Sequence, residues 1–341
     1  MQAIINALRL LAIPLGTIMF IFEVNAEVRN PTNSCITIER MRDGNYPAAY
    51  IYDAFRIEKP GQYCLMENII ARRILAISEG GEKNRSGAIG WISTSDVNLD
   101  LKGHQIIAET AGMWAIDAGN NANELIKNIA IRNGIIESKT SWGIQFINAF
   151  KWDLTTPKEE FFKTSQRVPR LRYIDEDDYK KFLAQKKQLQ TIFPQTKHFI
   201  ENLTINSFYR AVNIRGGGNT IKNCRIRING HTTGIDLSGP NQIIEGNHIT
   251  VKSEMGQGAP IVLKMADNSI IRNNVIVIET GGGSTDAAIN IIASKNVVIE
   301  NNKIVGAKMI YKTNYNEFEK KSAVIERGNE FASNLDAFIL K

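Results

Sequence analysis

A short phrase recurs seven times along the chain, and this repeat constrains the fold more than any other feature of the sequence. Each copy has an Ile or Leu, a small or amide residue two and three places later, and usually a second Ile. The copies begin at Leu101, Ile131, Ile205, Ile221, Ile244, Ile271 and Ile299. The last three intervals are 23, 27 and 28 residues. Such a period is typical of a solenoid, in which each repeat is one supersecondary unit and stacking buries a continuous core.

A second apolar phrase falls between the copies of the first. It occurs at residues 143–146, 211–214, 234–237, 260–263 and 288–291, with a first copy at 114–116. Residues 97–101 alternate apolar and polar, which is the period of a strand with one buried face. Two or more short strands in each repeat, without a crossover helix, must wind into a parallel β-helix. We therefore expect an all-β fold, with equivalent residues about 4.8 Å apart in successive coils.

The Asn-containing phrases, together with residues 97–104, resemble the right-handed parallel β-helix repeat proteins of the pectate-lyase-like superfold. The resemblance covers about residues 96–331. In that family, stacked Asn side chains form a ladder that satisfies backbone groups in one turn of every coil. The resemblance implies that the ladder contains Asn133, Asn223, Asn273 and Asn301, interrupted at Ser207 and Gly246. It does not imply one activity, because the superfold includes lyases, hydrolases, esterases and non-catalytic adhesins.

The sequence predicts four segments. Residues 1–26 have an apolar run and a small-x-small cleavage pattern, and we interpret them as a secretory signal peptide. Residues 27–94 are predicted to form an N-terminal cap, residues 95–331 the β-helix and residues 332–341 a C-terminal cap. An insertion of about residues 151–199 interrupts the β-helix, and its residues 175–191 have helical composition, with acids first and lysines later. The expected location is secreted or periplasmic, with no membrane span after cleavage.

The cysteines and charges limit the partners. An oxidising compartment favours a disulfide between Cys35 and Cys64, and Cys224 is expected to be a small buried residue. The chain has four His and no Cys/His cluster with zinc spacing, so we expect no transition metal and no cofactor; calcium stays an open alternative that no motif supports. The net charge of +6 suits an acidic polysaccharide or an envelope glycan. Nucleic acid is not expected, since no basic stripe is interleaved with aromatic residues; the oligomeric state stays open.

One outward face of the predicted coil combines cations with a carboxylate. Alternation in the second phrase sends Val212 and Ile214 inward. It sends two columns outward, which are Asn213, Asp236, Val262 and Asn290, and Arg215, Ser238, Lys264 and Ile292. We assign Arg215, Asp236 and Lys264 as candidate catalytic residues. The candidate substrate-binding residues are Asn213, His231, Ser238 and Asn290.

Two classes of function fit these residues. The first is an exported enzyme that binds and cleaves or modifies an acidic polysaccharide, by β-elimination if it is catalytic. In that reaction a base removes a proton next to a carboxylate while cations stabilise the developing charge. Hydrolysis would need two facing carboxylates, and only Asp236 is well placed. The second class is a non-catalytic envelope or surface protein. Aromatic residues beside the charged face would favour sugar binding, and the candidates are Trp142, Trp152, Tyr173 and Tyr209.

Overall fold

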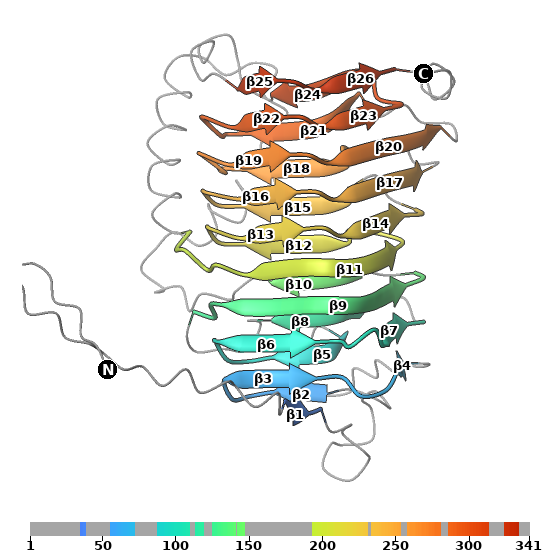
Figure 1. Ribbon diagram of the computed structural model, residues 1–341, viewed down its shortest axis with the longest axis vertical. Helices are drawn as coiled ribbons and strands as arrows, with labels where there is room; N and C mark the ends of the chain where they lie inside the picture. The colour runs from blue at the N-terminus through green and yellow to red at the C-terminus, as the bar shows by residue number, and fades with distance from the viewer. Residues whose placement is uncertain are drawn as a thin grey trace, which may run out of the picture. The chain divides into compact units, whose positions relative to one another are not determined.

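The strands stack in successive coils, one above the next, in a computed structural model of the protein (Figure 1). The structure describes residues 35–38, 55–71, 87–109, 113–118, 125–140, 142–146, 193–230, 233–253, 258–280, 286–313 and 324–333. These residues all belong to one unit, Cys35–Lys341. They contain no helix, and every pairing between their strands is parallel. The predicted all-β parallel β-helix is confirmed.

The described strands form two sheets. Sheet B has 9 strands, which are β2 (Phe55–Ile57), β5 (Gly87–Ile92), β8 (Met113–Ala118), β10 (Trp142–Phe146), β12 (Val212–Arg215), β15 (Ile235–Ser238), β18 (Ile261–Lys264), β21 (Ala287–Ile292) and β24 (Met309–Thr313). Sheet A has 17 strands and consists of two limbs. The limbs form one sheet because β9 (Ile129–Ser138) and β11 (Phe199–Ser207) run through both.

The first limb of sheet A contains the strands that follow sheet B in each coil. Besides parts of β9 and β11, these are β1 (Ile36–Thr37), β3 (Gly61–Cys64), β6 (Val97–Asp100), β13 (Thr220–Lys222), β16 (Ile243–Glu245), β19 (Ile270–Arg272), β22 (Val298–Glu300) and β25 (Ile325–Arg327). The second limb contains β4 (Ile69–Ala71), β7 (Gln105–Ala108), β14 (Arg225–Ile228), β17 (His248–Ser253), β20 (Val275–Thr280), β23 (Lys303–Val305) and β26 (Glu330–Ala332).

Apolar side chains fill the interior of the coils in register. Val212, Leu237, Leu263 and Ile291 of sheet B are all 0% exposed, as alternation predicts. The first Ile of the repeat phrase is equally buried in the first limb of sheet A, at Ile131, Ile200, Ile221, Ile244, Ile271 and Ile299. The prediction placed one copy at Ile205, but Ile205 pairs with the second Ile of its neighbours, Ile136 and Ile226. That copy therefore begins at Ile200, five residues earlier than predicted.

The Asn ladder lies one residue after the predicted positions. Asn133, Asn223, Asn273 and Asn301 have φ between 53° and 58°, and they form the corner between the two limbs of sheet A. Asn tolerates this left-handed backbone better than most residues, and Gly246 and Gly328 occupy the corner in other coils. The ladder consists of the next residues, which are the buried Asn247, Asn274 and Asn302 and the partly exposed Asn329, with Cys224 before them.

The side-chain amide of Asn274 links three coils of the β-helix. The Oδ1 of Asn274 accepts from the backbone N–H and from the Nδ2 of Asn247, at 2.9 and 3.0 Å. Its Nδ2 donates to the Ile244 carbonyl and to Asn302 Oδ1, both at 2.9 Å. The ladder thus satisfies backbone groups that a turn removes from the sheet.

A second buried polar column lies where sheet B passes into sheet A. The side chain of Asn219 accepts from Thr196 Oγ1 and the His198 N–H, and donates to Gln242 Oε1. His198 Nδ1 accepts from the Ile129 N–H at 3.2 Å. Burial lowers the pKa of His198 to about 3, so the ring is neutral in the folded protein. The sequence analysis did not predict this column.

The outer side of the first limb of sheet A carries charges that alternate in sign from coil to coil. The column is Asp100, Arg132, Glu201, Lys222, Glu245, Arg272, Glu300 and Arg327. Arg272 donates to Glu245 at 3.1 Å, which raises the pKa of the guanidinium, and Arg327 pairs with Glu300 at 2.6 Å. Opposite charges in adjacent strands favour the observed register.

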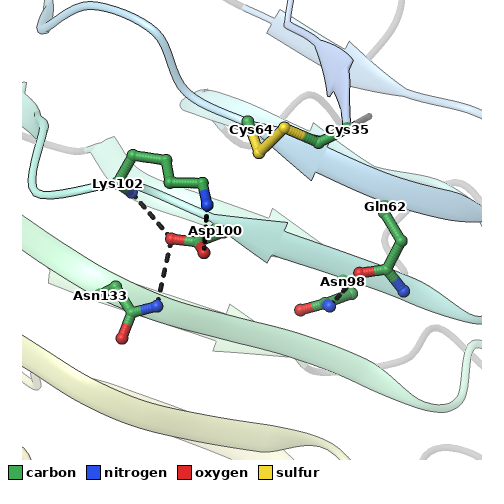
Figure 2. The surroundings of a disulfide bond; sticks show 7 residues. All are labelled: Cys35, Gln62, Cys64, Asn98, Asp100, Lys102 and Asn133. Atoms are coloured by element: carbon green, nitrogen blue, oxygen red, sulfur yellow. Dashed lines mark hydrogen bonds and ion pairs between the residues drawn. A yellow bond between two sulfur atoms is a disulfide. The ribbon is translucent and has the colours of Figure 1, made fainter. Parts of the chain in front are cut away.

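The first described coil is closed by a disulfide between Cys35 and Cys64, which confirms the predicted pairing (Figure 2). It attaches β1 to β3, whose neighbour in the next coil is β6. On β6, Asp100 accepts from the Lys102 N–H and from Asn133 Nδ2, at 2.9 and 3.2 Å. Burial opposes ionisation of Asp100, but these hydrogen bonds and Lys102 outweigh it and lower the pKa of the carboxyl.

The β-helix is longer at its N-terminal end than predicted. Strands β2, β3, β4 and β5 lie within the predicted cap, residues 27–94, yet they pair in register with the following coils. The predicted insertion is shorter at its C-terminal end, since Gln195 bridges to Gly217 and Phe199 begins β11. The predicted signal peptide, the helix at 175–191 and the cap residues 334–341 lie outside the described residues, as does most of the insertion.

Candidate functional site on the outer face of sheet B

The candidate residues lie on the outer face of sheet B, in the two columns that alternation predicts. Asn213 pairs with Asp236, Asp236 with Val262, and Val262 with Asn290. In the neighbouring column, Arg215 pairs with Ser238, Ser238 with Lys264, and Lys264 with Ile292. The columnar arrangement is therefore confirmed, whereas the chemical roles stay predictions.

Asp236 lies at the centre of a cationic cluster, which we define as Arg210, Arg215, Asp236 and Lys264. Its Oδ2 is 2.9 Å from Lys264 Nζ and 3.2 Å from Arg210 Nε. The side chain of Asp236 is 4% exposed, whereas those of Lys264 and Arg210 are 26% and 39% exposed. The carboxylate is thus buried beneath two cations that remain accessible from solvent.

Arg215 belongs to the same cluster because its charge interacts with those of Asp236 and Arg210. Burial lowers the pKa of its guanidinium, the nearby Asp236 carboxylate opposes that effect, and repulsion by Arg210 adds to it. The four ionised groups carry three positive charges and one negative charge. A net positive cluster of this kind attracts anions to the face on which it lies.

Arg210 is a member of the cluster that the sequence analysis missed. Arg210 directly precedes the apolar phrase at residues 211–214. Alternation within the strand therefore cannot predict whether its side chain points inward or outward. The turn of Phe208, Tyr209 and Arg210 brings its side chain to Asp236 in the next coil. The sequence does show a basic residue just before this apolar phrase. The geometry of the turn, which directs the Arg210 side chain towards Asp236, cannot be derived from alternation.

A stack of aromatic side chains ends at Tyr209, which directly precedes Arg210 of the cluster in the chain. The rings of Trp114 and Trp142 stack with centroids 5.0 Å apart, and those of Trp142 and Tyr209 with centroids 5.1 Å apart. Two of the four candidate aromatics, Trp142 and Tyr209, therefore converge. The other two, Trp152 and Tyr173, lie outside the described residues.

The predicted substrate-binding residues differ in their access to solvent. Asn213 and Asn290 are partly exposed, and the Oδ1 of Asn290 has no hydrogen-bond partner in the part of the chain that the structure describes. Ser238 is 8% exposed and lies between Arg215 and Lys264 in its column. His231 lies outside the described residues. Among the described residues, no group of three His, Cys, Asp or Glu side chains could hold a metal ion.

A comparison with known protein families also supports a β-helix. Residues 191–334 match a family model described as "Right handed beta helix region". The match covers less than half of the chain, and together with the two parallel sheets it supports a right-handed β-helix repeat fold. No curated protein and no solved structure matches the chain significantly. Within the described ranges, no helix has the length and apolar character needed to cross a bilayer.

Proposed function

We propose that the outer face of sheet B binds an acidic polysaccharide. The observation that carries the proposal is the cationic cluster, in which Arg210, Arg215 and Lys264 surround the single carboxylate of Asp236. Carboxylate or sulfate groups of a glycan would bind the accessible cations, and guanidinium groups suit such planar or tetrahedral anions. The net charge of +6 on the whole chain supports the same class of ligand.

Asp236 acts in this proposal by positioning the cations. Its carboxylate contacts both Lys264 and Arg210, so it orders two long side chains before a ligand arrives. Ordering them in advance lowers the entropy that binding would otherwise cost. Tyr209 directly precedes Arg210 in the chain and stacks on Trp142, and the two rings would offer apolar contact to a sugar.

A second candidate function is β-elimination of a uronic acid polymer on the same face. Arg215 is the candidate base, because it lies in one outward column with Lys264 and burial shifts the pKa of its guanidinium downward. The base would remove the proton next to the substrate carboxylate, and the electron pair would form a carbon–carbon double bond. The bond to the glycosidic oxygen breaks in the same reaction, and that oxygen takes a proton from solvent. Lys264 and Arg210 would stabilise the charge that develops on the carboxylate.

The proposed location is outside the cytoplasm, either secreted or periplasmic. The apolar N-terminal segment with its cleavage pattern supports export, and so does the disulfide between Cys35 and Cys64. The non-catalytic alternative, an envelope or surface protein that binds glycan, uses the same cations and differs only in the absence of turnover.

Binding and turnover can be tested on one set of variants. Affinity for immobilised acidic polysaccharides should fall about two- to fivefold in Lys264→Gln and in Arg210→Gln, because each loses one accessible cation. Lys252→Gln, which removes the same charge from sheet A, should bind like the original protein. Equal affinity of all three variants would contradict the proposed site.

Turnover is measured on the same polymers by the ultraviolet absorbance of new unsaturated ends. A lyase should produce them, and Arg215→Lys should lose that activity more severely than it loses binding. Binding without any new unsaturated ends would favour the non-catalytic alternative.

A further inference from the structure

The outer face of the first limb of sheet A carries an apolar stripe beside its column of alternating charges. In all coils of that column except the first, the outward residue two positions before the charge is apolar or Thr. These residues lie in register, and we define the apolar stripe as Ala130, Phe199, Thr220, Ile243, Ile270, Val298 and Ile325.

The stripe is accessible to solvent although it is apolar. Ile325 is 48% exposed and the other members are partly exposed. The inward Ile244, Ile271 and Ile299 of the same limb are 0% exposed. Where one face of a sheet is solvated, that face usually carries polar residues. A continuous exposed apolar stripe that is flanked by charges is typical of a surface that binds another protein.

The charge column beside the stripe is complementary to a reversed copy of itself. It alternates strictly in sign, from Asp100 in its first coil to Arg327 in its last. The two ends of the column therefore carry opposite charges. When such a column is turned end to end and placed against the original, each charge faces a charge of the opposite sign.

A twofold axis that runs parallel to the strands produces this arrangement. The axis lies midway between the coils of Lys222 and Glu245, which are neighbours in the column. Residues at equal distances from the axis then face each other across two copies of the chain. The facing charges are Asp100 and Arg327, Arg132 and Glu300, Glu201 and Arg272, and Lys222 and Glu245.

The same rotation places the apolar stripe against itself. Phe199 faces Ile270 of the second copy, and Thr220 faces Ile243. A parallel twofold arrangement would instead place each charge against an identical charge or against the stripe. Complementary charges select one orientation of two surfaces over others. The column thus favours antiparallel packing of two copies.

The size of the surface is sufficient for a weak dimer. The column and the stripe extend over roughly 38 Å along the β-helix axis, and together they are roughly 13 Å wide. Two copies would therefore bury about 1,000 Å² in total, which is near the lower limit for a specific interface. Association at this limit is weak, so we expect a dissociation constant on the order of 10 μM.

We propose that the outer face of the first limb of sheet A is the interface of an antiparallel homodimer. The apolar stripe and the charge column of one copy pack against those of a second copy, which is the partner that a self-complementary surface fits. The cationic cluster lies on sheet B, outside this interface, so the inference does not depend on the proposed function.

The oligomeric state of the purified protein is the first test. Sedimentation equilibrium should show mostly dimer at about 100 μM, well above the expected dissociation constant. A monomer at that concentration overturns the proposal. If Ile270→Cys in that monomer also resists a thiol reagent, a segment of the same chain covers the stripe in place of a second copy.

Charge reversal tests the facing of Lys222 and Glu245. Lys222→Glu and Glu245→Lys each create like charges at both symmetry-related contacts, so each variant alone should dimerise at least about tenfold more weakly. A mixture of the two variants restores opposite charges at both contacts, so it should form heterodimers about as tightly as the original protein dimerises. Lys252→Glu, on the second limb, is the matched control and should dimerise like the original protein.

The mixture separates this interface from a role of the same charges within one chain. Mixing changes no contact inside either chain, so a purely intramolecular role predicts no gain from it. A mixture that associates no better than its two components, or a control variant that is weakened as much as Lys222→Glu, overturns the proposed interface.

Discussion

Replacement of Asn274 by Ala should destabilise the β-helix far more than replacement of the adjacent Asn273 by Gly. Asn274→Ala removes four hydrogen bonds, two accepted by Oδ1 and two donated by Nδ2. It leaves two buried backbone groups without these partners, the N–H of Asn247 and the carbonyl of Ile244. Each such group costs about 1–3 kcal/mol, so the free energy of unfolding should fall by about 2–6 kcal/mol.

Asn273→Gly is the matched control. Asn273 is exposed and has a φ of 56°, which Gly adopts without strain, so its effect should stay within about 1 kcal/mol. Urea unfolding gives the stabilities, and hydrogen exchange of the Asn247 amide reports the ladder locally. The reasoning fails if Asn273→Gly destabilises as much as Asn274→Ala, or if the Asn247 amide keeps its protection in Asn274→Ala.

Three further predictions concern stability. His198 is neutral in the folded protein down to a pH of about 3, whereas an unfolded His binds a proton below about 6.5. The unfolded state therefore holds more protons in this range, and stability should fall by up to about 1.4 kcal/mol per pH unit as the pH drops from 6.5 towards 3. His198→Asn should have a flatter stability–pH profile in urea unfolding, and an unchanged slope would contradict the assignment. Replacing Cys35 and Cys64 by Ser should lower the free energy of unfolding by roughly 2–4 kcal/mol, measured against the oxidised protein, for a separation of 29 residues. Exchange protection should be lost first at β1; unchanged protection there would show that the disulfide does not hold this strand. Glu300→Lys should destabilise the protein more at low salt than at high salt, because it places a cation beside Arg327; a salt-independent loss would indicate a packing defect instead.

Strand periodicity was sufficient to predict the outward columns of sheet B from sequence. From Val212 on, an apolar residue stands at every second position of each strand, so the inward and outward residues can be assigned without knowing the turns, although the outward Val262 and Ile292 are apolar as well. The pairing of Arg215 with Ser238 and of Ser238 with Lys264 follows from that alternation and is found in the structure. The Cys35–Cys64 disulfide followed from an argument about the compartment.

The Asn ladder was misplaced by one residue because some copies of the phrase have two consecutive Asn. Asn273–Asn274 and Asn301–Asn302 do not show which amide is buried. The copy with Gly246 before Asn247 does show it, because Gly indicates the left-handed corner and leaves the next residue for the ladder. The same ambiguity affected Ile200 and Ile205, since both ends of the phrase are Ile.

Features that depend on turns could not be predicted from sequence. Arg210 reaches Asp236 because a turn directs it across to the next coil, and strand alternation contains no information about that direction. The column that joins Thr196, Asn219 and Gln242 likewise combines different residue types in loops of different length. The alternating charges of sheet A, in contrast, could have been found by aligning the residue after the first Ile of each copy.

The central claim is that successive coils place equivalent residues in register, and one distance tests it directly. Arg225 and Glu330 occupy the same outward column of sheet A through His248, Val275 and Lys303, although 105 residues separate them in the chain. Spin labels at these two exposed positions, in a Cys224→Ala background, should show backbone positions roughly 19 Å apart, which is four coil spacings. A narrow distribution consistent with that separation is expected. A mean distance far beyond it, or a broad distribution without a maximum there, would contradict the stacked β-helix and the sheet B face that depends on it.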